Sequence, residues 1–89
     1  MKAIVTVMGI DKAGIIAKVS GCLYNFNVNI LDINQTIMQN IFTMVMLVEL
    51  EGATDSMENI TSQLAKLGEE IGVDIRLQHE DIFKSMHRI

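Results

Sequence analysis

The sequence is poor in the features that cross-link small secreted proteins or place a chain in a membrane. Cys22 is the only cysteine among 89 residues, so no internal disulfide can form. The longest uninterrupted apolar run, Met44–Val48, is far too short to cross a bilayer, and the start of the chain has no secretory signal pattern. We therefore expect a cytoplasmic protein that makes no membrane contact and carries Cys22 as a reduced core residue.

Basic and aromatic residues are also scarce. Seven lysines and arginines stand against eleven acids, the net charge is −4, and the only local basic concentration is Lys84, His87 and Arg88. Because phosphate neutralisation requires a basic face, direct binding of nucleic acid is not expected. One tyrosine, three phenylalanines and no tryptophan leave few rings on which bases could stack.

Apolar residues, in contrast, make up 49% of the sequence, and the mean hydropathy is +0.32. A chain of this length supports one domain with a small core, which we place at residues 1–81, followed by a C-terminal tail, residues 82–89. Such a core cannot hide this many apolar side chains from water, so the composition predicts a homodimer or a higher oligomer. The tail has apolar residues at the spacing of a short amphipathic helix: Ile82, Phe83, Met86 and Ile89.

Hydrophobic periodicity predicts the order strand, helix, strand, strand, helix, strand. The expected strands cover residues 3–8, 28–38, 41–50 and 73–80. The helices are expected from two apolar stripes: Ile15, Ile16, Val19, Cys22, Leu23 and Phe26, then Met57, Ile60, Leu64, Leu67 and Ile71. Two right-handed crossovers then give an α+β, ferredoxin-like βαββαβ fold, with a four-stranded antiparallel sheet and both helices on one face.

Local signals refine this arrangement. Gln39 and Asn40 are typical of a two-residue turn between the second and third strands. Apolar residues fall on both parities around Leu31, which indicates a bulge or an edge strand that contacts a partner. Asp55, with Glu58 three positions later, resembles a capping box for the second helix.

The third strand is apolar on both of its faces. Phe42, Met44, Met46, Val48 and Leu50 share one parity, and Ile41, Thr43, Val45 and Leu47 share the other. A strand of this kind is central or covered by another subunit. We expect Met44 and Met46 to lie on the sheet face without helices, where a second domain would bury them.

The segment Met8–Ile16 runs from the first strand through a loop bracketed by Gly9 and Gly14 into the first helix. A helix N-terminus offers unpaired N–H donors and a partial positive charge, so it can hold a carboxylate. Asp11 in the same loop is placed to accept hydrogen bonds from an ammonium group, so the loop suits a small zwitterion. A second interpretation is that Asp11 caps the helix by accepting from the Ala13 or Gly14 N–H.

Two motifs resemble the ACT domain, a small regulatory module of amino-acid metabolism: Gly9–Ile15 entering the first helix, and Asn27–Ile30 opening the second strand. The resemblance covers nearly the whole chain. It extends to the ACT segments of formyltetrahydrofolate deformylase and of the glycine-cleavage repressor. The end of the chain, His79–Phe83 and Met86–Ile89, is similar to that of stand-alone prokaryotic ACT proteins. Asp11 stands where ACT domains that bind serine often have asparagine.

This resemblance implies a regulatory dimer that binds an amino acid where the first loop, the first helix and the second strand meet. A partner subunit would complete the pocket, and a separate enzyme or regulator would read the signal. The Gly14 and Ile15 N–H groups would hold the carboxylate, Asp11 the ammonium, and Asn29 either group. The expected ligand-binding residues are Gly9, Asp11, Ala13, Gly14, Ile15, Asn27 and Asn29.

Other functions of this fold lack the residues that they need. An acylphosphatase needs an arginine in the first loop and a copper chaperone a C-x-x-C motif there, whereas this loop has Asp11 and Lys12. No nucleophile and base pair is recognisable, so we expect neither catalysis nor a cofactor. Two alternatives stay open: a ligand-independent interaction module that uses the methionine-rich face and the tail, and a metal site at the weak candidates His79, Asp81 and His87.

Overall fold

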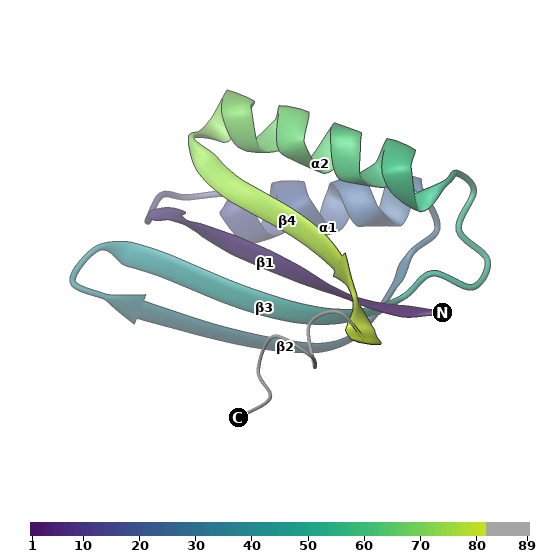
Figure 1. Ribbon diagram of the computed structural model, residues 1–89. Coiled ribbons are helices and arrows are strands. Elements are labelled where there is room, and N and C mark those ends of the chain that lie inside the picture. The colour runs from purple at the N-terminus through teal and green to yellow at the C-terminus, as the bar shows by residue number, and fades with distance from the viewer. Residues whose placement is uncertain (82–89) are drawn as a thin grey trace.

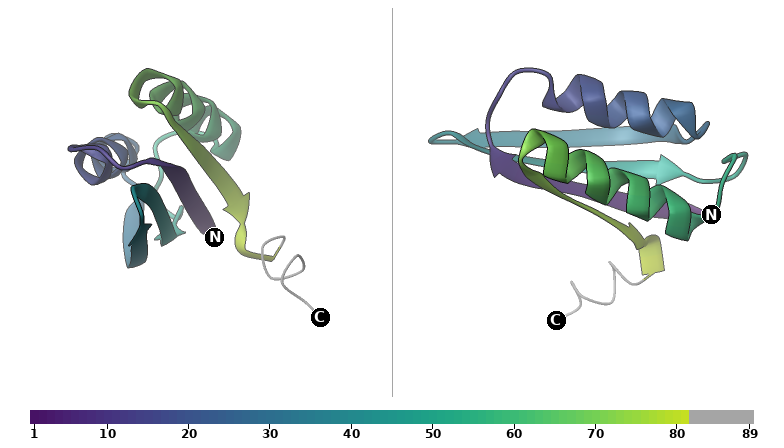
Figure 2. Two further views of the ribbon diagram at one scale, coloured as in Figure 1. Left: turned by 90° about the vertical axis from the view of Figure 1, so that its left-hand side faces the viewer. Right: turned by 90° about the horizontal axis from the view of Figure 1, so that it is seen from above.

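The computed structural model describes residues 1–81, and the predicted tail helix at 82–89 lies outside the described part of the chain. Six elements follow in the predicted order: β1 (Lys2–Ile10), α1 (Ile15–Asn25), β2 (Asn29–Met38), β3 (Ile41–Glu49), α2 (Met57–Ile71) and β4 (Val73–His79) (Figure 1). The strands form one antiparallel sheet in the order β2-β3-β1-β4. Both helices cover the same face of that sheet (Figure 2), so the predicted ferredoxin-like fold is confirmed.

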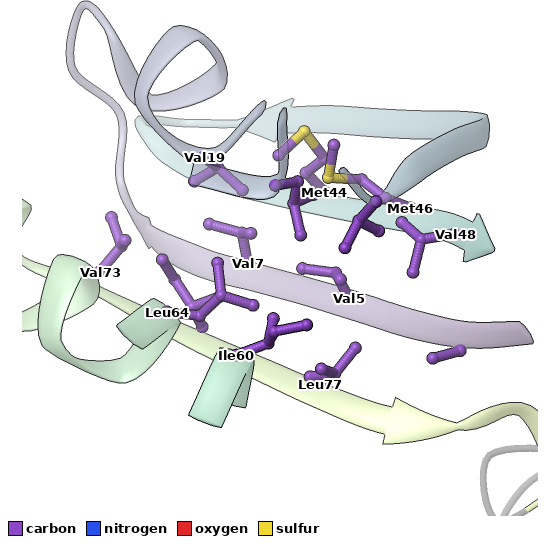
Figure 3. Close-up of a cluster of buried hydrophobic side chains, with 14 of the residues drawn as sticks. Val5, Val7, Val19, Met44, Met46, Val48, Ile60, Leu64, Val73 and Leu77 are labelled. Carbon is purple, nitrogen blue, oxygen red and sulfur yellow. The ribbon is translucent and has the colours of Figure 1, made fainter. Parts of the chain in front are cut away.

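The hydrophobic core lies between the sheet and the two helices (Figure 3). It includes seven side chains that are each at most 1% exposed: Val5, Val7, Val19, Met44, Met46, Ile60 and Leu64. Neither helix of residues 1–81 is long and apolar enough to cross a membrane. Each Å² of apolar surface removed from water contributes about 25 cal/mol to the free energy of unfolding, so this layer is the main source of stability.

The prediction that Met44 and Met46 lie on the helix-free face is wrong. Both side chains are fully buried beneath the helices, on the same face of β3 as Phe42 and Val48. The prediction failed because β3 is apolar on both faces, so its sequence did not show which face the helices cover. The helix-free face carries the other parity of β3: Ile41, Thr43, Val45 and Leu47.

The hairpin signals were read correctly. Gln39 and Asn40 have φ values of 55° and 106°, the left-handed conformations of a two-residue turn of type I′. The register of β2 against β3 shifts between Ile30 and Asp32, which is the bulge predicted near Leu31. This bulge leaves Leu31 without a partner on β3 and keeps the rest of β2 aligned with it.

The predicted capping box at Asp55 and Glu58 is wrong by one residue. Ser56 is the N-cap of α2, and its Oγ accepts a hydrogen bond of 3.1 Å from the Asn59 N–H. Asp55 supports this cap from outside, because its carboxylate accepts from the Ser56 N–H and from the Asn59 side-chain amide. Serine and aspartate are equally good N-caps, so local preference could not decide between them.

Two glycines allow α2 and β1 to approach β4 closely. A Cβ on Gly9 would lie 2.7 Å from Val73 Cγ1, and a Cβ on Gly68 would lie 2.5 Å from the Val73 carbonyl oxygen. Gly21, in the middle of α1, has no atom within 4 Å of such a Cβ. Glycine inside a helix costs about 1 kcal/mol of stability relative to alanine. Within residues 1–81, the close packing at Gly68 offsets this cost, whereas Gly21 allows no such packing.

Gly68→Ala and Gly21→Ala are therefore expected to change stability in opposite directions. Overpacking costs about 1–3 kcal/mol, whereas relief of a helical glycine contributes about 1 kcal/mol. We expect Gly68→Ala to lower the free energy of unfolding in urea and Gly21→Ala to raise it. Equal effects of the two substitutions would contradict the close approach of α2 to β4.

Candidate functional site

The first loop is tied to the far end of the β2–β3 hairpin. The Asp11 N–H donates a hydrogen bond of 2.7 Å to the Asn40 carbonyl oxygen. Gly14 then takes the N-cap position of α1 with a φ of 90°, a left-handed conformation that favours glycine. The loop thus delivers the start of α1 to the end of the sheet where β2 and β3 turn.

The first amides of α1 have no hydrogen-bond acceptor. The first bond of the helix runs from the Lys18 N–H to the Gly14 carbonyl at 3.0 Å, and no residue of 1–81 accepts from the N–H of Ile15, Ile16 or Ala17. No side chain caps the helix, so the interpretation of Asp11 as an N-cap is wrong. These donors and the partial positive charge of the helix N-terminus are available to an anion.

A cleft of about 450 Å³ lies at these amides, and we call it the loop cleft. It is lined by Asp11, Lys12, Gly14, Ile15, Ile16, Ala17, Gln35, Ile37 and Phe42. The lining thus combines the residues at the start of α1, the exposed Asp11 and the apolar residues Ile37 and Phe42. Because Gln35 and Ile37 belong to β2, an edge strand of the sheet, the loop cleft borders that free edge.

Lys12 brings a positive charge to the same loop and fixes it to α2. A Cβ on Gly72 would lie 3.1 Å from Lys12 Nζ, so this ammonium lies at the C-terminal end of α2. The negative end of a helix dipole stabilises a cation in this place. The loop cleft is therefore lined by an acidic residue, Asp11, and by the positive end of α1, while Lys12 lines it with an ammonium that reaches the end of α2.

The structure brings together only part of the predicted ligand set. Asp11, Gly14 and Ile15 line the loop cleft, and Ala13 lies exposed in the same loop without being part of the lining. Gly9 belongs to β1, where its lack of a side chain serves the packing against Val73 described above.

Asn27 and Asn29 lie at the other end of α1. Asn27 turns the chain with a φ of 58° and donates from its side chain to the Gly52 carbonyl at 2.9 Å. β3 pairs Asn29 with Glu49 at one end and Ile10 with Ile41 at the other. Eight residues of strand separate these two ends by roughly 25 Å, so within one protomer the asparagines are remote from the loop cleft.

A second hollow, also of about 450 Å³, lies between the two helices and includes Cys22, Tyr24 and Lys66 in its lining. Cys22 packs against the core as predicted, and partial burial raises the pKa of its thiol. A raised pKa keeps the thiol protonated and poorly nucleophilic at neutral pH. This hollow is lined by side chains from within the helices and has no free helix N-terminus, so the loop cleft is the better candidate site.

The predicted metal candidates are only partly within the described chain. The Asp81 N–H donates to His79 Nδ1 at 3.1 Å, while His87 lies outside the described residues. Within residues 1–81, no three His, Cys, Asp or Glu side chains come together as a metal site would require.

Comparison with known proteins identifies the family. The family model of the ACT domain matches residues 2–78, and the chain belongs to the ACT domain family. A UPF0237 protein of Clostridium acetobutylicum is 51% identical over 89 residues and covers 100% of both chains. A UPF0237 protein of Methanopyrus kandleri is 48% identical over 88 residues, which are 99% of this chain and 98% of the other.

Solved structures show the same fold. An ACT domain protein from Streptococcus pneumoniae is 37% identical, has a TM-score of 0.82 and is covered over 93% of both chains. A formyltetrahydrofolate deformylase from Pseudomonas syringae (21% identity, TM-score 0.79) matches 88% of this chain with 27% of its own. A protein assigned as a glycine cleavage system transcriptional repressor (25% identity, TM-score 0.71) matches 86% with 44% of its own. The resemblances predicted from the sequence are confirmed.

Hydrogen exchange tests whether the amides of α1 are free. In the protein without ligand, we expect the exposed Ile16 and Ala17 N–H groups to exchange at least about tenfold faster than the Lys18 N–H, which is hydrogen-bonded. The measurement is amide exchange followed by NMR. Equal protection of all three amides would mean that an internal acceptor already occupies the site.

Proposed function

We propose that this protein is an amino-acid sensor whose ligand binds in the loop cleft at the interface of a homodimer. Membership of the ACT domain family supports a regulatory, ligand-binding role in general. The observation that carries the specific proposal is the set of free amides at Ile15, Ile16 and Ala17, three residues that line one cleft together with Asp11. The proposed role requires neither a cofactor nor catalysis.

The chemistry of the loop cleft matches the three parts of an amino acid. The ligand carboxylate accepts from the free N–H groups of α1, because the helix dipole and the unpaired donors both favour an anion there. The ligand ammonium donates to the Asp11 carboxylate in a charge-assisted hydrogen bond. The side chain then lies along Ile16, Ile37 and Phe42, with the Gln35 amide as the polar group beside them.

The free edge of β2 is the surface that we assign to the homodimer. β2 has ten residues without lysine or proline, the residues that usually protect an edge strand from pairing. Ile33 and Ile37 are 43% and 53% exposed along it. The Ile33 N–H donates a hydrogen bond of 2.9 Å to the neighbouring Asp32 carboxylate, so this N–H takes no part in the hydrogen bonds between β2 and β3.

Antiparallel pairing of two β2 strands centred on Gln35 fits this edge. It sets Ile33 of each copy opposite the partner's Ile37. The pairing therefore covers both exposed apolar side chains, at two symmetry-related places. The two-residue turn makes Met38 and Ile41 a hydrogen-bonded pair, so the backbone groups of Ile33, Gln35 and Ile37 point away from β3 and toward the partner.

The same pairing accounts for Asn29, one of the two predicted asparagines. The start of the partner's β2 reaches the end of this protomer's β2, where the Asn40 carbonyl holds Asp11. The partner's Asn29, the first residue of its β2, thereby comes to the side of the loop cleft. Ligand binding across this seam favours one arrangement of the two subunits, and a partner enzyme or regulator reads that arrangement.

A ligand-independent interaction module is the second candidate function. The exposed apolar residues on the helix-free face of the sheet favour it, in place of the buried methionines that the sequence suggested. The two functions differ in their response to amino acids: a sensor binds one of them stereospecifically, and a constitutive module binds none. A metal-binding role has less support, because it rests on His79 and Asp81 alone within the described residues.

Asp11→Ala is the variant that tests the sensor. Calorimetric titration with the twenty amino acids is expected to give a hit that Asp11→Ala weakens by about tenfold to a hundredfold, since a charged hydrogen bond contributes about 1.5–3 kcal/mol. Glu69→Ala, an exposed acid on α2, is the control and leaves the affinity unchanged. Absence of binding across the whole panel, or an unchanged affinity of Asp11→Ala, would contradict the proposal.

Gln35→Cys tests the proposed seam. Paired strands place opposite Cα atoms about 4.5–5.5 Å apart, within the range of a disulfide. In a Cys22→Ser background, mild oxidation is expected to convert Gln35→Cys into a covalent dimer on a non-reducing gel. Gln63→Cys, on α2, is the control, and equal cross-linking of the two variants would refute pairing through β2.

A further inference from the structure

On the sheet face opposite the helices, no further helix or strand of residues 1–81 lies over the four strands (Figure 2). We call this face the open face. Registered pairs across β1 and β3 build its centre: Ile4 with Leu47, Thr6 with Val45, Met8 with Thr43, and Ile10 with Ile41. Met8, Ile10 and Ile41 are 50%, 55% and 48% exposed, so their end of the open face meets water in the single chain, whereas Ile4 at the other end is 9% exposed.

Polar side chains border the centre on both sides. Asp74, Arg76 and Gln78 of β4 form one border, and Asp32, Asn34 and Thr36 of β2 form the other. An apolar centre inside a polar rim is the composition of a protein interface. Contiguous apolar patches of this kind on soluble chains usually mark a binding surface.

We propose that the occupant of the open face is a second copy of this chain, packed sheet against sheet. Asp74 and Arg76 lie two residues apart on β4 and form an ion pair of 3.0 Å at the rim. A two-fold axis perpendicular to the strands, passing between these two residues, places Arg76 of each copy over the partner's Asp74. Self-complementary charge of this kind is what a two-fold interface requires.

The same axis matches the apolar centre with itself. It sets Ile4 over the partner's Ile10 and Leu47 over the partner's Ile41. The exposed end of one copy, at Ile10 and Ile41, therefore packs on the less exposed end of the other. Asp32 is the only charged side chain in the β2 border, so no like charges face each other there. The level of the axis falls at Gln35, where the pairing of β2 strands in the proposed function is also centred.

The area involved explains why this contact would accompany the β2 seam. Four strands about 4.8 Å apart and about seven residues long give roughly 450 Å² per copy, or roughly 900 Å² for both. Specific interfaces begin at about 1,000 Å², so one pair of open faces makes a weak contact. A dimer joined through β2 presents two open faces at once, and two such dimers gain from simultaneous contact. The expected assembly has four copies.

The open face can be tested apart from ligand binding, although the four-copy assembly rests on the β2 seam of the proposed function. The molar mass of the full chain, measured by light scattering after size exclusion, is expected to equal four copies. Met8→Lys and Val45→Lys each introduce an ammonium into the open face and are expected to halve that mass. Tyr24→Lys, at an 81% exposed position on α1, is the control and leaves four copies.

A charge reversal tests the orientation. Arg76→Asp is expected to halve the mass because acids of both copies then face one another, and the double variant Arg76→Asp, Asp74→Arg is expected to restore it. A mass that Met8→Lys and Val45→Lys leave unchanged would overturn the proposal, because another protein or nothing then occupies the face. A two-copy mass that both variants reduce to one copy would support the open-face contact and overturn the β2 seam instead. Amino-acid affinity measured on the same variants reports on the sensor separately, since none of these residues lines the loop cleft.

Discussion

The hydrogen bond from the Asp11 amide to the Asn40 carbonyl fixes the first loop against the β2–β3 turn, and the position of the loop cleft depends on it. It sets the start of α1 beside the end of β2. Gly14 then begins the helix in a left-handed conformation, so no side chain reaches back to cap the first amides. A chain with a net charge of −4 thereby presents a positively polarised surface made by its backbone.

The order of the elements was predictable because each depends on local periodicity. The turn at Gln39 and Asn40 and the bulge at Leu31 were predictable for the same reason, since turn chemistry and a break in alternation are written in neighbouring residues. The burial of Met44 was not, because β3 is apolar on both faces and only the helices decide which face becomes the core. Long-range packing, and not propensity, settled that question.

The candidate site shows the same division. Asp11, Gly14 and Ile15 were found from the loop itself, whereas Gln35 and Ile37 were missed because the sheet register brings them to the cleft. Counting back from the predicted turn would have placed the end of β2 at the same end of the sheet as the end of β1, with β3 between them. Asn29 was expected at the same place, but it lies at the opposite end of the sheet, roughly 25 Å away, so one protomer cannot supply it. The two-fold seam that we propose through β2 accounts for this difference without moving any element.

The central claim is that the free amides at the start of α1 receive the carboxylate of an amino acid. A titration of ¹⁵N-labelled protein with each amino acid, followed by NMR, tests it most directly. The expected result is a saturable shift for one ligand class, largest at the Ile15, Ile16 and Ala17 amides. Saturable shifts confined to the hollow between the helices, or no saturable shift with any amino acid, would contradict it.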